Sequence, residues 1–406
     1  MTELPYRGLE VPSDWDRRGL PAWTYRSEAL FRLERRKLFL THWQIVGHVN
    51  DLPAIGDWLT FDLLNERAVI MRGNDGEVRA FHNLCRHRGA RVLDGEKGHC
   101  RGAVVCPFHG WVYNLDGSLR GAAQPGTFRG MDRSAFGLKP IELDLFHGFI
   151  FIRFAPGPQG AISEVLAPYE EDFAAYAPEQ QLPAETASWA TELPVNWKSV
   201  RDVDNEGYHV PLAHPSLQDL YGRDYRDIYL DGQLHMAIGY FNEDGARRWS
   251  VREYLKLTDG GPGLPRHLRR AWSYYGLFPN TVIGFTPEGA YFYQEIPLAP
   301  NRTRVTGREY RHGHETRQQR LARYLAARIN RDTSREDQQL SLWSDESMRS
   351  SAFENFHLSD LEWGLRRHHD KLRGILPVMS IYTTPAEHEV ETLDASLSRQ
   401  TTASER

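Results

Sequence analysis

Cysteine is scarce in this sequence, which has only Cys85, Cys100 and Cys106 among its 406 residues. Three cysteines are too few for the disulfide framework of a secreted protein, and a chain of this length can bury enough surface to fold without one. The opening segment, MTELPYRGLEVPSDWD, contains acidic side chains and no apolar run, so it does not resemble a signal peptide. We therefore expect a protein of the reducing cytoplasm.

Long apolar runs and blocks of like charge are also missing. No stretch approaches the ~20 apolar residues that a membrane-spanning helix needs. The chain carries 49 basic and 54 acidic residues, for a net charge of −5. The arginine-rich stretch 317–331 is interpreted as the solvated face of a helix, because phosphate binding requires a more concentrated basic surface. Neither nucleic acid nor a membrane is therefore an expected partner.

The pattern of elements predicts an α+β protein with more than one domain. Short β-rich runs, separated by turns such as Asn74-Asp75-Gly76, predict a small all-β domain, and Pro156–Gly160 resembles a linker. Beyond it, helical runs flank a strand-rich region from Gln233 to Val305, which is typical of an antiparallel sheet covered by helices. Two of the expected helices are Arg317–Ile329 and Glu336–Arg349. The expected parts are a helical segment at 1–40 that packs with the second domain, the all-β domain at 41–156, the second domain at 157–384, and a mobile polar tail at 385–406.

Two short segments each pair one cysteine with one histidine. Cys85 and His87 lie in CRHRGA, and Cys106 and His109 lie in CPFHGW, after 18 intervening residues. Zinc is one candidate for a site of two thiolates and two imidazoles, but zinc fingers take both cysteines from one segment and both histidines from another. A Rieske [2Fe–2S] cluster instead holds one iron by two cysteines and the other by two histidines. The mixed pairing favours the cluster, and Cys100 is interpreted as a small structural residue.

A second pair of histidines, His209 and His214, lies in the segment YHVPLAHP. Residues five apart do not share a face of a straight helix, and Pro211 disfavours a continuous helix here. A helix that ends near His209 would let the chain turn so that both rings converge. By itself the pair is weak evidence for a metal site, because ordinary surface or core histidines explain it as well.

Together these segments resemble one family. CRHRGA followed by CPFHGWVYNLDG, and NWK at 196–198 followed by YHVPLAHP, closely resemble the alpha subunits of Rieske-type non-haem iron oxygenases. This family includes aromatic-ring-hydroxylating and betaine-demethylating enzymes. The resemblance implies a Rieske domain joined to a helix-grip catalytic domain, in which helices pack on an antiparallel sheet. It also implies two cofactors, a [2Fe–2S] cluster and a mononuclear Fe(II).

The resemblance also assigns the ligands of the cluster. By analogy with the family, Cys85 and Cys106 hold one iron, and His87 and His109 hold the other. Replacement of two thiolates by neutral imidazoles removes negative charge and raises the reduction potential of the cluster.

For the mononuclear iron, the resemblance implies His209, His214 and a carboxylate, which together form a 2-His-1-carboxylate triad with open positions for O₂. The family carries this acid far downstream at the start of a helix, and we assign it to Asp337. The competing acids are Asp332, Glu336 and Asp345. A structural explanation is also open, since Ser334 and Asp337 have the spacing of a capping box.

Glu206 lies three residues before His209. In the family, an acid at this position links the histidine of the catalytic iron to a Rieske histidine of the neighbouring subunit, which implies a head-to-tail ring, here a homotrimer. The alternative is an ordinary exposed acid. Many members have Asp at this position, whereas Glu resembles the trimeric oxygenases of betaine-like substrates. The segment departs from the family at Arg201-Asp202, where Glu-Asn is usual.

The expected function is that of a terminal oxygenase component, either a monooxygenase or a dioxygenase. Its only Gly-x-Gly, at Gly261 and Gly263, lacks the remainder of a dinucleotide fingerprint, so a separate NAD(P)H-dependent flavin or ferredoxin-type reductase is the expected partner. With O₂, the enzyme would hydroxylate or oxidatively demethylate a small organic substrate, and chain length and Glu206 favour a methylated ammonium compound. The alternatives are hydroxylation of an aromatic ring or aromatic acid, and a Rieske electron-transfer protein without oxygenase activity.

Overall fold

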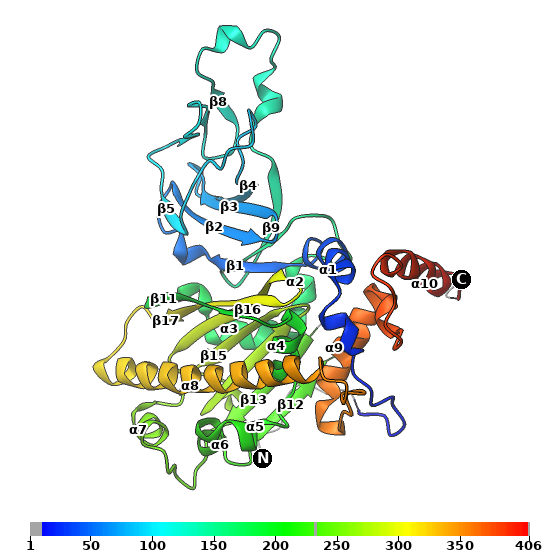
Figure 1. The fold of residues 1–406 in the computed structure, drawn as a ribbon. Coiled ribbons are helices and arrows are strands. Elements are labelled where there is room, and N and C mark those ends of the chain that lie inside the picture. The colour runs from blue at the N-terminus through cyan, green and yellow to red at the C-terminus, as the bar shows by residue number, and fades with distance from the viewer. Residues whose placement is uncertain (1–9, 231–233, 405–406) are drawn as a thin grey trace. The chain divides into compact units, whose positions relative to one another are not determined.

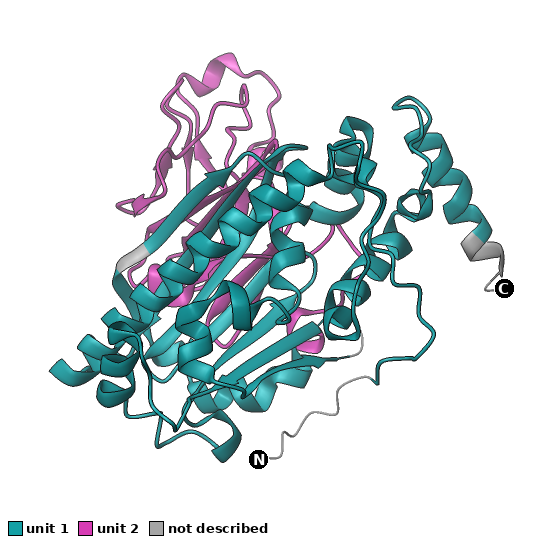
Figure 2. Cartoon of the chain, turned by 60° about the horizontal axis from the view of Figure 1, so that its bottom comes forward, with its two compact units in different colours: residues 1–39, 166–406 teal, residues 40–165 magenta. Residues whose placement is uncertain are grey.

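The computed structural model describes residues 10–230 and 234–404, so the expectations for residues 1–9 and for Gln233 lie outside the described residues. The chain divides into two compact units, one of residues 40–165 and one of residues 1–39 and 166–406 (Figure 2). The unit of residues 40–165 continues past the expected linker because the linker packs onto it. The backbone N–H of Trp43 donates to Gln159 at 2.8 Å, and the indole N–H of Trp43 donates to the carbonyl of Gly160 at 2.9 Å.

The unit of residues 40–165 is built from antiparallel strands. A sheet of seven strands has the order β1-β10-β9-β4-β3-β2-β5, and a small sheet has the order β6-β7-β8. The strands are β1 (Gln44–His48), β2 (Asp57–Leu63), β3 (Glu66–Arg72), β4 (Val78–His82), β5 (Lys97–His99), β6 (Val104–Val105), β7 (Val112–Tyr113), β8 (Leu119–Gly121), β9 (Pro140–Phe146) and β10 (Phe149–Arg153). A short helix, α2 (Ile162–Val165), follows and packs against β9.

A single apolar cluster joins the two cysteine-containing segments of this unit. Cys85 and Cys106 are both buried and pack with Trp58, Trp111 and other core side chains. The segments that carry them are therefore held by the core of the unit, although their tips reach the surface.

The other unit contains a seven-stranded antiparallel sheet of order β11-β17-β16-β15-β14-β13-β12. Its strands are β11 (Leu182–Leu193), β12 (Tyr225–Tyr229), β13 (Leu234–Tyr240), β14 (Ala271–Leu277), β15 (Thr281–Thr286), β16 (Gly289–Ala299) and β17 (Arg302–Arg311). Its helices are α1 (Glu28–Glu34), α3 (Glu170–Tyr176), α4 (Trp197–Asp204), α5 (Val210–Ala213), α6 (Pro215–Tyr221), α7 (Trp249–Leu257), α8 (Arg317–Ser347), α9 (Trp363–Ile375) and α10 (Val390–Ser404). Helices on an antiparallel sheet confirm the expected α+β class.

The longest helix, α8, runs across one face of this sheet (Figure 1). Its buried residues Ala322, Leu325, Ala326 and Ile329 follow helical spacing and pack against α6, α7 and the sheet. The sequence predicted two helices here, Arg317–Ile329 and Glu336–Arg349, with Asp337 in the first turn of the second. That expectation is wrong, because the residues between them carry no proline or glycine and the helix continues through them.

The C-terminal segment also differs from its expectation as a mobile tail. Residues Val390–Ser404 form α10, which packs against α1. Asp394 is fully buried, lies 2.6 Å from the ammonium group of Lys37, and accepts a hydrogen bond from the backbone N–H of Val378. The polar composition of the segment concealed these few buried contacts, which hold the helix in place.

None of the helices in the described ranges is long and apolar enough to cross a membrane. Although α8 has the length, it is amphipathic and carries many charged side chains.

Candidate active site

The two cysteine-histidine segments have the same backbone conformation. The N–H of Cys85 donates to the carbonyl of Ala90 and the N–H of Gly89 to the carbonyl of Cys85, at 2.7 and 2.8 Å. In the second segment, Cys106 bonds to Trp111 and Gly110 bonds to Cys106 with the same spacing, at 2.7 and 3.0 Å. The structure therefore contains two equivalent loops, each of which presents one sulfur and one imidazole.

Each loop turns at a glycine with positive φ, +74° at Gly89 and +66° at Gly110, and a Cβ at either position would meet no atom within 4 Å. These loops bring His87 and His109 to a ring separation of 4.6 Å. The Nδ1 atom of His87 is buried without a hydrogen-bond partner, as expected of an atom that binds a metal.

The spacing of the four side chains also bears on the zinc alternative. Among the described residues, the ligand atoms of Cys85, His87, Cys106 and His109 do not include three that all lie within 4.8 Å of one another. Tetrahedral zinc would draw its ligands within that distance, whereas a two-iron cluster keeps its cysteine and histidine pairs apart. The arrangement therefore fits the cluster better than a single ion.

Tyr113 is a functional candidate that sequence reasoning missed. Its hydroxyl accepts a hydrogen bond from the backbone N–H of Arg86 at 3.0 Å and lies 3.2 Å from the sulfur of Cys85, which leaves the hydroxyl proton free for the sulfur. Hydrogen bonds to cluster sulfurs tune the reduction potential. Its position in the motif CPFHGWVYNLDG was the available signal.

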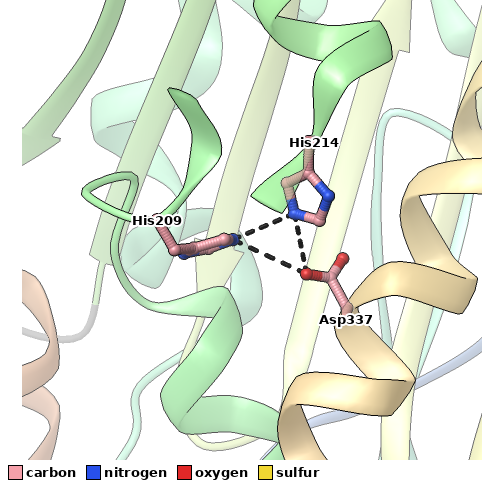
Figure 3. A group of neighbouring side chains, drawn as sticks. All are labelled: His209, His214 and Asp337. Carbon is pink, nitrogen blue, oxygen red and sulfur yellow. Dashed lines mark hydrogen bonds and ion pairs between the residues drawn. The ribbon is translucent and has the colours of Figure 1, made fainter. Parts of the chain in front are cut away.

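In the unit of residues 1–39 and 166–406, the structure brings His209, His214 and Asp337 together (Figure 3). The Nε2 atoms of the two histidines are 3.0 Å apart, and Oδ1 of Asp337 lies 2.8 Å from Nε2 of His214 and 3.5 Å from Nε2 of His209. The histidines come from either end of α5, and the carboxylate comes from the middle of α8. Residues more than 120 positions apart in sequence therefore point at one place.

Two prolines explain why histidines five residues apart converge. Pro211 lies in the first turn of α5 and therefore allows this single-turn helix to begin directly after His209. Pro215 forces the preceding residue, His214, out of helical geometry, and its φ and ψ are −115° and 78°. The chain turns at His214 before α6 begins. A turn near this pair of histidines, by which both rings converge, was expected from the sequence.

The triangle of ligand atoms has the dimensions of a facial metal site. Three atoms about 2.1 Å from one ion, at right angles to one another, stand about 3.0 Å apart. The observed separations of 2.8, 3.0 and 3.5 Å lie close to that value. Oδ1 of Asp337 is buried and receives no hydrogen bond of good geometry, so the donor set fits a metal ion.

Each histidine of the triad has a carboxylate at its other ring nitrogen. Oε1 of Glu206 lies 2.5 Å from Nδ1 of His209, and Oε2 of Glu336 lies 2.9 Å from Nδ1 of His214. A carboxylate at this position fixes the tautomer and directs Nε2 toward a metal. Glu336 was expected only as a competing ligand, so its contact with His214 is a role that the sequence did not indicate.

The charges of the site favour a cation at its centre. Burial lowers the pKa of His209, but the carboxylates of Asp337 and Glu206 outweigh burial and raise this pKa to about 10. The pKa of His214 is raised in the same way, chiefly by Asp337 against the effect of burial. Burial raises the pKa of Asp337, yet the adjacent imidazoles hold it below its ordinary value.

The remaining competitors for the third position have other surroundings. Asp345 is buried and accepts hydrogen bonds from the backbone of Asn196 and the hydroxyl of Ser199, which makes it a link between α8 and α4. Asp332 is not in the group of three. Because α8 is continuous, Ser334 is an interior helix residue and does not cap a helix.

The triad lines a cavity of about 560 Å³ between α8 and the sheet. This volume suits a small organic molecule. Besides the triad and Glu206, the lining includes three further carboxylates and five large aromatic side chains. These residues are Asp204, Glu295, Glu309, Trp189, Tyr225, Tyr274, Tyr291 and Tyr293.

A larger, open cavity of about 1380 Å³ lies over α6 and the loops on either side of α7. It carries seven arginines and none of the expected ligands. We therefore place the active site in the smaller cavity, where the convergent side chains are.

Known proteins agree with both halves of this description. Residues 42–132 match the family model of the Rieske [2Fe-2S] domain, and residues 182–377 match that of the ring hydroxylating alpha subunit (catalytic domain). The glycine betaine monooxygenase oxygenase subunit of Chromohalobacter salexigens is 31% identical over 327 residues, which cover 71% of this chain and 69% of that protein. The carnitine monooxygenase oxygenase subunit of Escherichia coli is 32% identical over 268 residues, or 66% of this chain and 67% of that protein.

Solved structures share the fold. A quaternary ammonium Rieske monooxygenase superposes with a TM-score of 0.75 at 22% identity and covers 88% of this chain and 95% of its own. Naphthalene 1,2-dioxygenase superposes with a TM-score of 0.68 at 19% identity and covers 94% and 97%. With a Rieske [2Fe–2S] domain and a non-haem iron catalytic domain in one chain, this protein belongs to the Rieske-type oxygenases, as the alpha subunit that carries the oxygenase site.

Proposed function

We propose that this subunit oxidises a small methylated ammonium compound at one of its N-methyl groups. The observation that carries the proposal is the cavity itself, where the triad faces a wall of tyrosines and carboxylates. Aromatic faces and carboxylates are the groups that bind organic cations. The relatives that act on glycine betaine and carnitine have substrates of this class.

The reaction consumes one O₂, two electrons from a separate reductase and two protons. A C–H bond of the methyl group becomes C–OH, and the second oxygen atom leaves as water. The resulting N-hydroxymethyl group loses its hydroxyl proton and its C–N bond breaks, so that formaldehyde is released and the amine keeps the electron pair of that bond. Formaldehyde is therefore the diagnostic product.

In this proposal, Cys85, His87, Cys106 and His109 hold the [2Fe–2S] cluster in the loops described above. His209, His214 and Asp337 hold the mononuclear iron, which supplies O₂ activation when bound. A set of two histidines and one carboxylate would leave the iron open to O₂, while the substrate would lie in the cavity beside it. These assignments are supported by the converging atoms, by the buried Nδ1 of His87 that has no hydrogen-bond partner, and by the buried Oδ1 of Asp337 that receives no hydrogen bond of good geometry.

We also propose that the subunits form a head-to-tail homotrimer in the cytoplasm, in which Glu206 bridges His209 and His109 of the partner subunit. The proposal is supported by two exposed apolar surfaces. Tyr208 and Leu212, beside His209, are 58% and 90% exposed, and Phe108, beside His109, is 53% exposed. Exposed apolar groups beside both ends of the proposed bridge are suited to form an interface.

The experiment supplies iron-loaded protein with NADH and a reductase that reduces its cluster, and compares glycine betaine, choline and carnitine with benzoate and other aromatic acids. We expect O₂ uptake with formaldehyde release from a methylated ammonium compound. His214→Ala should abolish turnover and keep the cluster spectrum, whereas the matched control His357→Ala, at an exposed loop position, should retain both. A hydroxylated aromatic acid without formaldehyde would replace the proposal, and turnover by His214→Ala would remove the triad from it.

A further inference from the structure

Three charged side chains, those of Arg201, Glu295 and Asp204, contact one another beside the active-site cavity, and the two carboxylates line it. The guanidinium of Arg201 donates to Glu295 through Nε at 3.0 Å and through Nη2 at 2.6 Å, and its Nη1 lies 2.9 Å from Oδ2 of Asp204. The side chains of Arg201 and Glu295 are 3% and 1% exposed. Arg201 is one of the residues at which this segment departs from the family motif.

This group contains two acidic side chains but only one basic side chain. One guanidinium stands against two carboxylates, so the group is net negative when both are ionised. Burial raises the pKa of Glu295 to about 7 even though Arg201 lowers it, and the negative charge of Asp204 adds to the rise. Such a charge is unfavourable unless a cation neutralises it. Of the two carboxylates, Asp204 is the one with a free side, since its side chain is 27% exposed and lines the cavity.

The surroundings of Asp204 are suited to an organic cation. The hydroxyl of Tyr293 donates to Oδ1 of Asp204 at 2.5 Å, and the ring of Tyr291 stacks beside that of Tyr293 at 6.4 Å. Both tyrosines line the cavity, as does Tyr274. Aromatic faces attract a cation through their quadrupole, most strongly where water is excluded.

The other charges that line the cavity are already engaged or lie toward its rim. Glu206 and Asp337 contact the histidines of the triad. Burial raises the pKa of Glu309, and the positive charges of Arg323 and Arg331 act against that rise. Arg331 and Arg335 are exposed basic members of the lining and lie on α8. The unbalanced charge therefore lies at Asp204, inside the cavity, whereas the positive groups lie near the solvent.

We propose that Asp204, held by Arg201 and Tyr293, is the residue that selects a positively charged head group for this active site. The inference deepens the proposed function and rests on it for the choice of substrate. It makes charge, in addition to the shape of a trimethylated group, the basis of recognition. A carboxylate at this position also accepts an N–H, so protonated dimethylamines should bind as well as quaternary compounds do.

The test compares choline with 3,3-dimethylbutan-1-ol, which has the same shape but a carbon in place of the charged nitrogen. Binding to the anaerobic iron-loaded enzyme is measured by calorimetry, without turnover. We expect the wild type to prefer choline by at least roughly tenfold. Asp204→Asn should reduce that preference to about threefold or less, because the remaining Arg201–Glu295 pair is neutral.

Asp224→Asn is the matched control, because it makes the same change at an exposed carboxylate of the same unit and should leave the preference unchanged. Tyr293→Phe removes the hydrogen bond to Asp204 but keeps the ring, so it should maintain or increase the preference. If Asp204→Asn does not fold, the test relies on Tyr293→Phe, and loss of the preference for choline in that variant overturns the inference. Unchanged discrimination in folded Asp204→Asn also overturns it.

The outcome is separable from that of the proposed function. If no methylated ammonium compound supports formaldehyde release, but Asp204→Asn still weakens choline binding selectively, the proposed reaction fails and the cation site stands. If formaldehyde forms but choline and 3,3-dimethylbutan-1-ol bind equally well, the proposed reaction is supported and the proposed role of Asp204 is wrong.

Discussion

Each histidine of the proposed iron triad has one nitrogen that faces the other two members and one that faces a glutamate. For His209 that glutamate is Glu206, three residues away in the chain. For His214 it is Glu336, adjacent to the third ligand on α8. Removal of such a second partner typically weakens metal binding by 10- to 100-fold, because the ring loses its orientation and some basicity.

We therefore expect Glu336→Gln to reduce ferrous iron affinity about tenfold or more. The measurement is iron retained after dialysis against graded chelator, with the cluster spectrum as an internal reference for folding. Glu346→Gln, at an exposed position of the same helix, is the control and should keep the wild-type iron content. Equal retention by both variants would mean that Glu336 does not orient His214.

Another buried residue, Glu288, predicts how stability depends on pH. Burial raises its pKa from an ordinary value of 4.5 to about 7, even though the hydroxyls of Thr258 and Tyr254 donate to it. The folded protein therefore holds this proton more tightly than the unfolded chain. The stabilisation is complete below pH 4.5 and is lost as pH rises through about 7.

Glu288→Gln should remove this dependence. Between pH 4.5 and 7.5 we expect the free energy of unfolding of the wild type to fall relative to the variant by roughly 3 kcal/mol. Urea unfolding at several pH values gives the difference curve, in which other titrating groups cancel. Parallel curves would show that Glu288 stays ionised in the folded protein.

Among the elements, α8 has the greatest effect on the site. Asp337 follows Ala326 by eleven residues, about three turns, so both lie on the face that packs toward the sheet. A helix that ended near Ile329 would lose this register. The position of the proposed third ligand thus depends on the apolar packing of residues eight or more positions away.

A proline in the middle of α8 tests this dependence. Ser334→Pro removes a helical hydrogen bond and bends the axis, at about 3 kcal/mol or more, between the packed half of the helix and Asp337. We expect loss of the mononuclear iron with the cluster spectrum retained, measured as iron per subunit and visible absorbance. Ser334→Ala should behave as the wild type, and full iron content in Ser334→Pro would contradict a continuous helix.

At the scale of the whole molecule, the two cofactors belong to different compact units of the chain. If Glu206 connects to the cluster of a neighbouring subunit, each active site is shared between two chains. Such an arrangement allows one defective chain to complement another.

Co-expression of Cys106→Ala, which lacks a cluster ligand, with His214→Ala, which lacks an iron ligand, should therefore restore activity that neither variant has alone. In a head-to-tail trimer, one of the three junctions in each mixed assembly is productive, so we expect the isolated mixed assemblies to have roughly a third of wild-type turnover. Two affinity tags isolate the mixed assemblies for the assay. Inactive mixed assemblies would place electron transfer within one chain.

The local chemistry of this protein was readable from the sequence. The cysteine-histidine loops and the turn at His214 depend on neighbours within a few residues, where glycine and proline restrict the backbone directly. The resemblance to Rieske oxygenases rested on these same short segments. The class of the fold followed from the spacing of apolar residues.

Contacts between distant elements were determined only by the tertiary structure. Glu336 at His214, Arg201 between Glu295 and Asp204, and the docking of Asp394 each join residues from separate parts of the chain. The continuity of α8 belongs with them, since packing against α6, α7 and the sheet supports it. Local sequence restricts the backbone angles of a few residues, but only the packed sheet and helices determine which distant charges meet.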